Sequence, residues 1–268
     1  MNAMRCIFCK QNSSSSKSVE HIIPESLWNT EHILPKGIVC DSCNNYFARE
    51  VEKPFLDSQA ILLLRFQQAI PNKRGRIPEV RGVMLPGFEV IARRTRKNPY
   101  EMAVEVPPEA LAHINTRAHG RIVFPNSGDP PDARIVSRFL AKMSLEALAM
   151  RVGFEKANLD YLTDEVQLDA LRNFARRGTP KNWPFSMRRI YSVDRILAET
   201  DGSWYQTVHE FDFLVTATNE WYFVFALFGL EFAINLGGPE IDGYLAWIKE
   251  NGNSSPLYSG RNSISKSP

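Results

Sequence analysis

Hydrophobic positions recur with helical spacing in the central part of the chain. Between Ile135 and Met150, apolar side chains return every three or four residues, which predicts an amphipathic helix. Asp132 is suited to cap the start of this helix, and Gly153 is suited to end it. The same spacing predicts helices over residues 163–178, 58–69 and 239–250, and one that begins near residue 41.

Stretches with strand-like composition separate these helices. They are rich in β-branched and aromatic residues and cover residues 83–92, 102–106, 121–124, 190–196, 203–218 and 221–235. The most apolar run, 221–236, is shorter than the roughly 20 residues that a membrane span needs, so we expect buried strands there. Helices and strands mix without a βαβ rhythm, which favours an α+β fold over a doubly wound sheet.

Composition fits a small domain followed by a larger one. The chain has 268 residues, of which 44% are hydrophobic and 23% charged, so a packed core is feasible. We expect a small N-terminal domain over residues 1–57, a larger mixed α+β domain over residues 58–250, and a flexible polar tail over residues 251–268. Because the net charge is only +2, contact with nucleic acid must come from a local basic patch.

The four cysteines form two C-x2-C pairs near the N-terminus: Cys6, Cys9, Cys40 and Cys43. A disulfide framework would spread over the core that it braces, whereas two tight pairs at one end indicate a tetrahedral Zn²⁺ site. The first residues contain no apolar signal segment, and free thiols suit a reducing compartment, so we expect a cytoplasmic protein.

A short motif lies between the two cysteine pairs. Residues 20–24 read Glu-His-Ile-Ile-Pro, and Asn44 directly follows the last cysteine. This arrangement resembles the zinc-ribbon type of HNH (ββα-metal, His-Me finger) endonucleases over roughly residues 5–55. The resemblance implies a small ββα-metal domain in which His21 is the general base. It also implies that Glu20 and Asn44 bind a catalytic Mg²⁺ or Mn²⁺ ion.

The chemistry of phosphodiester hydrolysis agrees with these roles. A neutral histidine can take a proton from water near neutral pH, and hard oxygen ligands suit Mg²⁺. Many members of the family carry a further asparagine about five residues before the third cysteine, where this chain has Pro35. Asn29 or Asn45 is the candidate replacement for that brace. We expect no metal binding by the other histidines or by the acidic residues of the following helix: His32, His113, His119, His209, Glu50 and Glu52.

A basic stretch follows the motif. Nine basic residues lie between Arg65 and Lys97, where only Glu79 and Glu89 oppose them. Such a local excess suits contact with phosphates. The candidate nucleic-acid-binding residues are Arg74, Arg76, Arg93, Arg94, Arg96 and Lys97. The alternative is a set of solvated loop charges.

These expectations lead to a metal-dependent endonuclease that acts on nucleic acid, with double-stranded DNA as the expected substrate. The resemblance implies a setting in phage defence, restriction or a mobile element. The alternative is a zinc-ribbon protein that binds nucleic acid or regulates without catalysis, and an RNA-directed nuclease is a third interpretation. Association as a homodimer is left open, and no membrane partner is expected.

Overall fold

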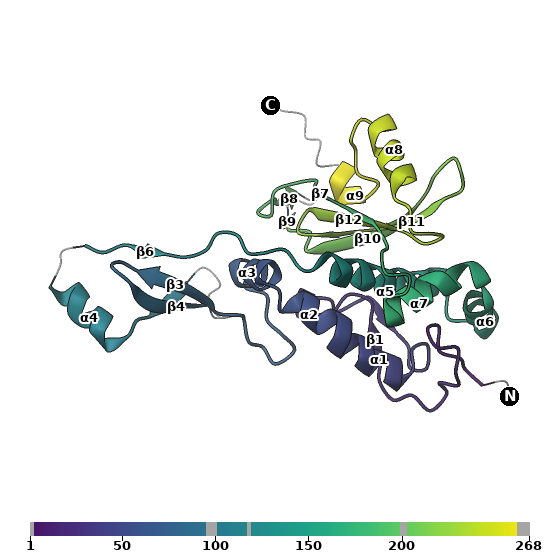
Figure 1. Cartoon of the computed structure of the whole chain (residues 1–268), viewed down its shortest axis with the longest axis horizontal. Coiled ribbons are helices and arrows are strands. Elements are labelled where there is room, and N and C mark those ends of the chain that lie inside the picture. Colours follow the sequence, from purple (N-terminus) through teal and green to yellow (C-terminus); the bar gives the residue numbers. More distant parts are fainter. Residues whose placement is uncertain (1–2, 95–100, 117–118, 199–202, 262–268) are drawn as a thin grey trace. The chain divides into compact units, whose positions relative to one another are not determined.

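The computed structural model describes residues 3–94, 101–116, 119–198 and 203–261 (Figure 1). Its contacts divide the chain into two compact units. The first unit comprises Met1–Ile22, His32–Val51 and Arg134–Pro268, and the second comprises Ile23–Glu31 and Glu52–Ala133. Both units draw on the first 60 residues, so this division does not follow the linear boundary expected near residue 57. Helices and strands are mixed in both units, which confirms the α+β fold class.

A ββα arrangement opens the first unit. Strands β1 (Glu20–His21) and β2 (Ile33–Leu34) pair antiparallel, and helix α1 (Asp41–Phe47) follows them. The side chain of Cys40 caps the start of α1, so the second cysteine pair leads straight into the helix. A π-helical turn over Ala48–Glu52 continues from α1. This is the ββα order that the HNH resemblance implies.

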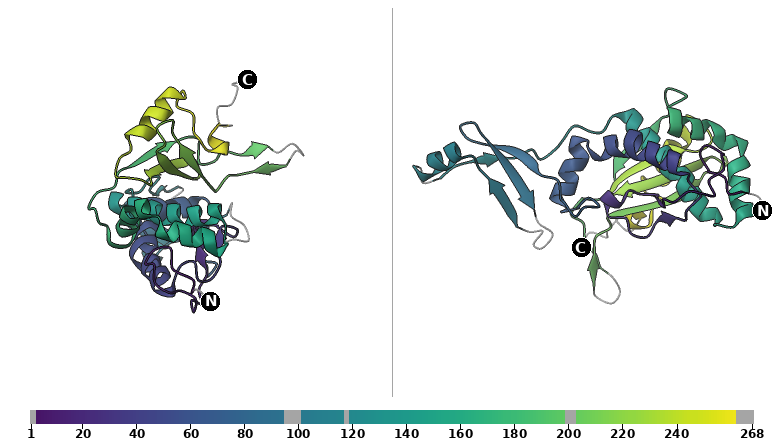
Figure 2. Two further views of the ribbon diagram at one scale, coloured as in Figure 1. Left: turned by 90° about the vertical axis from the view of Figure 1, so that its right-hand side faces the viewer. Right: turned by 90° about the horizontal axis from the view of Figure 1, so that it is seen from below.

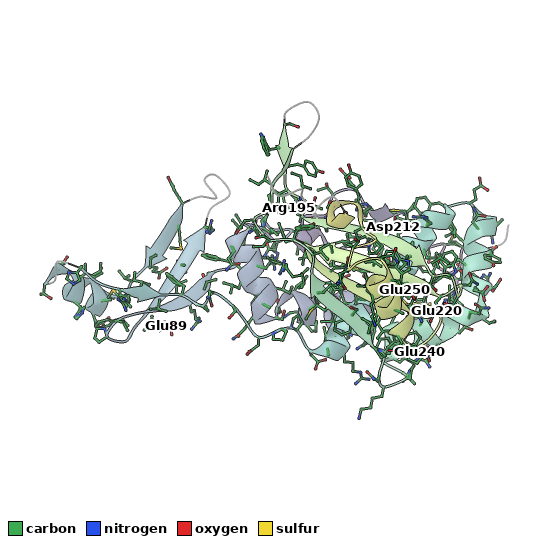
Figure 3. All side chains as sticks on the ribbon, turned by 90° about the horizontal axis from the view of Figure 1, so that it is seen from above. Glu89, Arg195, Asp212, Glu220, Glu240 and Glu250 are labelled. Atoms are coloured by element: carbon green, nitrogen blue, oxygen red, sulfur yellow. The ribbon has the colours of Figure 1, made fainter. Side chains whose placement is uncertain are left out.

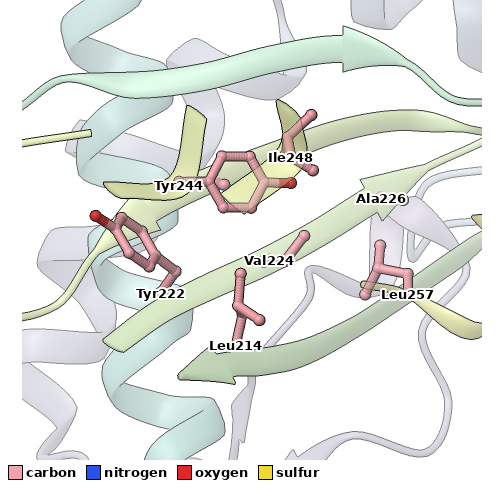
Figure 4. Close-up of a cluster of buried hydrophobic side chains, with 8 residues drawn as sticks. Leu214, Tyr222, Val224, Ala226, Tyr244, Ile248 and Leu257 are labelled. Atoms are coloured by element: carbon pink, nitrogen blue, oxygen red, sulfur yellow. The ribbon is translucent and has the colours of Figure 1, made fainter. Parts of the chain in front are cut away.

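An antiparallel sheet forms the core of the first unit, with strand order β10-β11-β12-β7. Its strands are β7 (Phe185–Arg189), β10 (His209–Val215), β11 (Trp221–Leu227) and β12 (Leu230–Asn235). Helix α8 (Asp242–Glu250) covers one face, where Tyr244 and Ile248 pack against Tyr222 and Val224 of β11 (Figure 4). Because β11 is buried on both faces, its sequence is apolar almost throughout.

Helix α5 (Ala133–Val152) lies on the face of this sheet opposite α8 (Figures 1 and 2). Arg151 near its end stacks 5.9 Å above the ring of Phe213 and pairs with Asp212 of β10. From Phe139 to Ala149, nearly every side chain of α5 is buried, so the helix is covered on all sides. The first unit also contains α6 (Lys156–Asp164), a 3-10 turn (Val166–Leu168), α7 (Asp169–Arg177) and a small sheet of β8 (Leu197–Ala198) and β9 (Trp204–Tyr205).

The second unit is built on a sheet with strand order β5-β4-β3-β6. Its elements are a 3-10 turn (Glu25–Leu27), α2 (Lys53–Leu56), α3 (Gln59–Gln67), β3 (Val80–Met84), β4 (Phe88–Arg94), β5 (Met102–Glu105), α4 (Pro108–Asn115) and β6 (Ile122–Val123). Leu63 and Phe66 of α3 pack on Val80 and Ala92 of the sheet. This sheet carries three arginines of the basic stretch, namely Arg81, Arg93 and Arg94.

Several element predictions need correction. The strand expected over residues 83–92 is a hairpin of β3 and β4, because Pro86 and Gly87 form the turn between them. Residues 190–196 form no strand, and the edge strand β7 lies just before them. The helix expected over 163–178 begins only at Asp169, since Glu165 has an extended backbone that ends α6. Helices α4 and α6 were not predicted.

The tail expected to be flexible from residue 251 is partly packed. Ser255 and Leu257 are buried, and a short helix, α9 (Tyr258–Arg261), follows them. The hydroxyl of Ser255 donates to the buried carboxylate of Glu231, and the backbone N–H of Ser259 donates to Glu210 at 3.1 Å. Two serines that suggested a solvated tail therefore satisfy acidic groups of the core sheet, and one of these groups, Glu231, is buried. Residues 262–268 lie outside the described residues.

A membrane-spanning helix was not expected. In the described part of the chain, no helix combines the length and the apolar character needed to cross a bilayer.

Candidate functional site

The four cysteines meet at one point of the first unit. Their sulfur atoms all lie within 4.8 Å of one another, and the Sγ atoms of Cys9 and Cys40 are 3.7 Å apart. A tetrahedral zinc ion with Zn–S bonds of about 2.3 Å places its sulfur ligands about 3.8 Å apart. The cluster therefore fits a four-cysteine zinc site.

Backbone geometry around the cysteines also suits thiolate ligands. The N–H of Cys40 donates to Cys6 Sγ, and the N–H of Cys43 donates to Cys40 Sγ, both at 3.4 Å. A hydrogen bond from the Cys43 thiol, supported by backbone N–H groups, lowers the pKa of Cys6 to about 5. Burial raises the pKa of Cys9 to about 11. Several thiolates together need a compensating cation, and a zinc ion at the centre would supply it.

Helix α1 holds the chain that enters the hairpin. The carboxylate of Asp41 accepts hydrogen bonds from the backbone N–H groups of Lys17 (3.1 Å) and Ser18 (3.0 Å) and from the Ser18 hydroxyl. The Ser18 hydroxyl and the two backbone N–H groups lower the pKa of Asp41. One turn further on, Nδ2 of Asn44 donates to the backbone oxygen of Val19 at 3.0 Å. The helix and strand β1 are therefore joined by side chains of the helix.

The structure thus brings the three predicted catalytic residues to one place. Asn44 lies against the residue that precedes Glu20, and Glu20 and His21 are the two residues of β1. Neighbouring residues of a strand point to opposite faces. Accordingly, Glu20 is buried, with 5% of its surface exposed, while His21 is half-buried.

Helix α5 adds a residue that the sequence analysis missed. The Nζ atom of Lys142 lies 2.6 Å from Oε1 of Glu20 and 3.0 Å from Oε2 of Glu146, and it donates to the backbone oxygen of His21 at 3.1 Å. The side chains of Lys142 and Glu146 are fully buried. The signal was present in the sequence, because this lysine and glutamate stand at i and i+4 in an otherwise apolar stretch of helix.

The oxygen donors of Glu20 and Asn44 are of the kind that a divalent ion prefers. The carboxylate of Glu20 and the amide oxygen of Asn44 are the hard donors that Mg²⁺ prefers. Such an ion would share the Glu20 carboxylate with the Lys142 ammonium group.

Asn29 closes the loop that joins the two strands of the hairpin. It is fully buried, and its Nδ2 donates to the backbone oxygen of Ile23 at 2.7 Å, while its Oδ1 accepts from the N–H of Glu31 at 3.1 Å. Of the two candidates for the bracing asparagine, Asn29 makes these loop contacts. Asn45 is exposed on α1.

The remaining histidines are found in aromatic packing or at the surface. The ring of His32 meets Phe211 edge-on at 4.8 Å and His209 at 5.9 Å. His113 packs against Phe88 at 5.4 Å, and His119 is exposed.

Two arginines of the basic stretch are neutralised by acidic neighbours. Arg93 pairs with Glu79 at 3.0 Å and also with Glu105, which lies on the adjacent strand β5. Arg81 pairs with Glu89 at 3.0 Å across the β3–β4 hairpin (Figure 3). The sequence analysis overlooked Glu105 because it lies beyond the end of the stretch.

The other candidate binding residues of the stretch fall into three groups. Arg94 stacks 5.3 Å above the ring of Phe66. Arg74 and Arg76 are exposed, and no described carboxylate pairs with either of them. Arg96 and Lys97 lie outside the described residues. Among the candidate nucleic-acid-binding residues that the structure describes, Arg74 and Arg76 are thus the two best placed to contact phosphates.

A second basic surface lies beside α1 in the first unit. Arg176 and Arg177, at the end of α7, line a cavity of about 310 Å³ together with Ser42, Cys43 and Tyr46. Neither arginine forms an ion pair with a carboxylate in the described part of the chain. Hydroxyl and guanidinium donors in one cavity suit an anion.

Comparison with known proteins identifies the N-terminal part. Residues 6–59, about a fifth of the chain, match a family model described as HNH endonuclease. The match begins at Cys6 and covers both cysteine pairs, the hairpin and α1. No curated protein and no solved structure shows significant similarity to this chain.

Proposed function

We propose that this chain, whose residues 6–59 form an HNH endonuclease domain, is a metal-dependent nuclease that hydrolyses phosphodiester bonds of double-stranded DNA. One observation supports the proposal most strongly. Helix α1, which begins at the zinc cysteines, places Asn44 against the strand that carries Glu20 and His21. These are the positions to which the HNH resemblance assigns catalysis, with Glu20 in the place of the usual aspartate or histidine.

The chemistry proposed for these residues is as follows. His21 accepts a proton from the attacking water at its imidazole nitrogen, which a neutral histidine can do near neutral pH. Glu20 and Asn44 would hold Mg²⁺ or Mn²⁺, which stabilises the charge on the phosphate and the leaving oxygen when bound. A zinc ion held by the four cysteines would take no part in the reaction, because four sulfur ligands would leave no open position.

Binding of nucleic acid falls to arginines that are not already neutralised. In the second unit these are Arg74 and Arg76, and in the first unit they are Arg176 and Arg177. Contacts of this kind go to phosphates and carry no sequence information. We therefore propose modest sequence preference, in a cytoplasmic protein that acts in phage defence, restriction or a mobile element.

One observation favours a second candidate function, a zinc-ribbon protein that binds nucleic acid without cutting it. The Glu20 carboxylate is buried and engaged by Lys142, so it resembles a structural group as well as a metal ligand. In a protein of this kind, the hairpin and helix would be retained only as a scaffold.

Incubation with a panel of substrates separates the two candidates. Purified zinc-loaded protein is mixed with supercoiled plasmid, linear duplex, single-stranded DNA or RNA, each with Mg²⁺, Mn²⁺ or EDTA. We expect metal-dependent nicking or linearisation of the plasmid, and none with EDTA. Binding of DNA without cleavage under every metal condition would favour the non-catalytic candidate, and cleavage confined to RNA would overturn the assignment of DNA.

A further inference from the structure

We propose that Lys142 of helix α5 is a positioning residue of the nuclease site, so that the HNH hairpin depends on a residue about 120 positions further along the chain. The inference rests on the proposed nuclease function and extends it. Lys142 lies far outside residues 6–59, the segment that matches the HNH family model.

The hairpin itself has little backbone structure to hold its catalytic residues. Strands β1 and β2 contain two residues each and pair over just two positions. A ladder of this length is marginal by itself. The orientation of Glu20 and His21 must therefore come from groups outside the hairpin.

Those groups contact β1 from two elements. From α1, Asp41 holds Lys17 and Ser18, and Asn44 holds Val19, so this helix fixes the chain up to the residue before Glu20. From α5, the ammonium group of Lys142 contacts the side chain of Glu20 and the backbone oxygen of His21. One side chain of α5 therefore contacts both catalytic residues of β1.

Lys142 is itself held firmly. Its side chain is fully buried, on a helix whose neighbouring positions are also buried. Glu146, one turn later on the same helix, forms an ion pair with the ammonium group at 3.0 Å and is also fully buried. A buried ammonium group needs such oxygen partners, because burying it without them is very costly.

Burial also limits what Lys142 can do. A side chain without exposed surface does not reach a phosphate in solvent, so Lys142 acts through Glu20 and the His21 backbone. Misplacement of a catalytic group by about 1 Å can reduce the rate by about 10²-fold. Loss of Lys142 should therefore lower kcat while leaving KM for DNA nearly unchanged.

The competing interpretation is that the Glu20–Lys142–Glu146 cluster only stabilises the core. Glu146→Gln provides the matched control. The amide oxygen of the new side chain can accept a hydrogen bond from Lys142, and the contacts between Lys142 and the hairpin are kept. The test variant is Lys142→Met, which keeps the length of the side chain and removes the ammonium group. Lys142→Arg serves as the conservative rescue, since it restores the charge.

The experiment measures kcat and KM on plasmid DNA, zinc content and the melting temperature for each protein. We expect kcat of Lys142→Met to fall by about 10²-fold, with KM within about threefold and one zinc per chain retained. Glu146→Gln should keep kcat within about threefold of wild type, and Lys142→Arg should recover part of the loss. If Lys142→Met does not fold, the same comparison is made between Lys142→Met/Glu146→Gln and Glu146→Gln alone.

Two outcomes would overturn the inference. One is a Lys142→Met protein that cleaves DNA as fast as wild type. The other is an equal loss of kcat in Glu146→Gln, which would show that any disturbance of the buried cluster has the same effect. In both cases the wild type still cleaves DNA, so the proposed function stands.

A measurement that needs no catalysis covers the case in which the wild type does not cleave. Unfolding equilibria are measured for wild type, Glu20→Gln, Lys142→Met and the double variant. If Lys142 holds the hairpin through Glu20, the two substitutions should not act independently. The unfolding constant of the double variant should then differ by about tenfold or more from the value expected when the effects of the two single variants are added as free energies. Additive effects would overturn the positioning role, whatever the activity.

Discussion

The ββα site of the first unit and the arginine-rich sheet of the second unit both carry residues that suggest nucleic-acid chemistry. In the first, the structure gathers the expected cysteines into one cluster and places Asn44 against the strand of Glu20 and His21. In the second, Arg93 and Arg81 are paired with acidic residues of the same sheet. One set of expected residues is assembled, whereas in the other set two arginines are already neutralised by acidic neighbours.

The difference shows what each kind of pattern can specify. Two C-x2-C pairs fix four sulfur atoms in space, because one metal must reach all of them. A count of charges fixes no geometry. The partners of an arginine on a sheet lie across the strands, and Glu105, which pairs with Arg93, comes from β5, outside the basic stretch.

Loss of the zinc site should produce the largest effect. Cys40→Ser removes a ligand, and structural zinc contributes about 10–16 kcal/mol to folding in zinc-finger peptides. We expect the purified variant to contain no zinc, to lose order in residues 1–51 and to have no nuclease activity. Elemental analysis and amide hydrogen exchange measure this, and Ser15→Ala, at an exposed position, serves as the control. Full zinc content and native exchange in Cys40→Ser would contradict the site.

The next largest effect is expected on DNA binding, when arginines without an acidic partner are replaced and compared with arginines that have one. Arg176→Ala with Arg177→Ala should flatten the slope of log affinity against log salt by about 1.8 for duplex DNA, since each lost phosphate contact contributes about 0.9. Arg81→Ala with Arg93→Ala should leave the slope nearly unchanged, because acidic neighbours already neutralise these charges. Filter binding at several salt concentrations measures the slope for both double variants. The opposite ranking would move the DNA path to the second unit.

A smaller effect is expected when Arg93 is released from its partners. Glu79→Gln with Glu105→Gln removes both carboxylates that contact Arg93. The slope against log salt should then become steeper by up to about 0.9 if DNA passes this sheet. The same titration in an Arg93→Ala background is the control. A steepening that persists there would mean that Arg93 is not the group released.

The smallest expected effect concerns Asp41. Its carboxylate has a lowered pKa in the folded state, so it contributes stability above its unfolded pKa of about 3.9. This contribution is lost as pH falls through the folded-state pKa. Wild type should therefore be more stable than Asp41→Asn at pH 7, and the difference should vanish at low pH. Urea unfolding at a series of pH values measures it, and a difference that is independent of pH would contradict the role of this carboxylate.

The parts of the fold that could be predicted are those governed by local patterns. The spacing of apolar residues was sufficient for α3, α5 and α8. The strand predicted over residues 83–92 failed because periodicity does not register a turn at Pro86 and Gly87. The tail prediction failed because Ser255 and Ser259 bond to acidic groups of the core sheet, a tertiary effect that composition does not contain.

The residues of the candidate site also differ in whether local sequence patterns could predict them. Residues joined to the zinc pairs by short spacing, such as His21 and Asn44, could be named from the sequence. Lys142 could not, because its contact with Glu20 joins residues more than 100 positions apart. The apolar spacing also indicated a helix with one buried face, whereas α5 is buried all round, and this burial makes its lysine a functional candidate.

The proposed role of His21 as the general base can be tested by comparing cleavage rates. Cleavage rates of supercoiled plasmid at saturating Mg²⁺ or Mn²⁺ are compared for wild type, His21→Ala and His32→Ala. We expect kcat of His21→Ala to fall by about 10²–10⁴-fold, with zinc content unchanged, because a general base contributes about this factor to the rate. We expect a rate near wild type for His32→Ala, whose ring packs against Phe211. Wild-type cleavage by His21→Ala, or a loss confined to His32→Ala, would contradict this role.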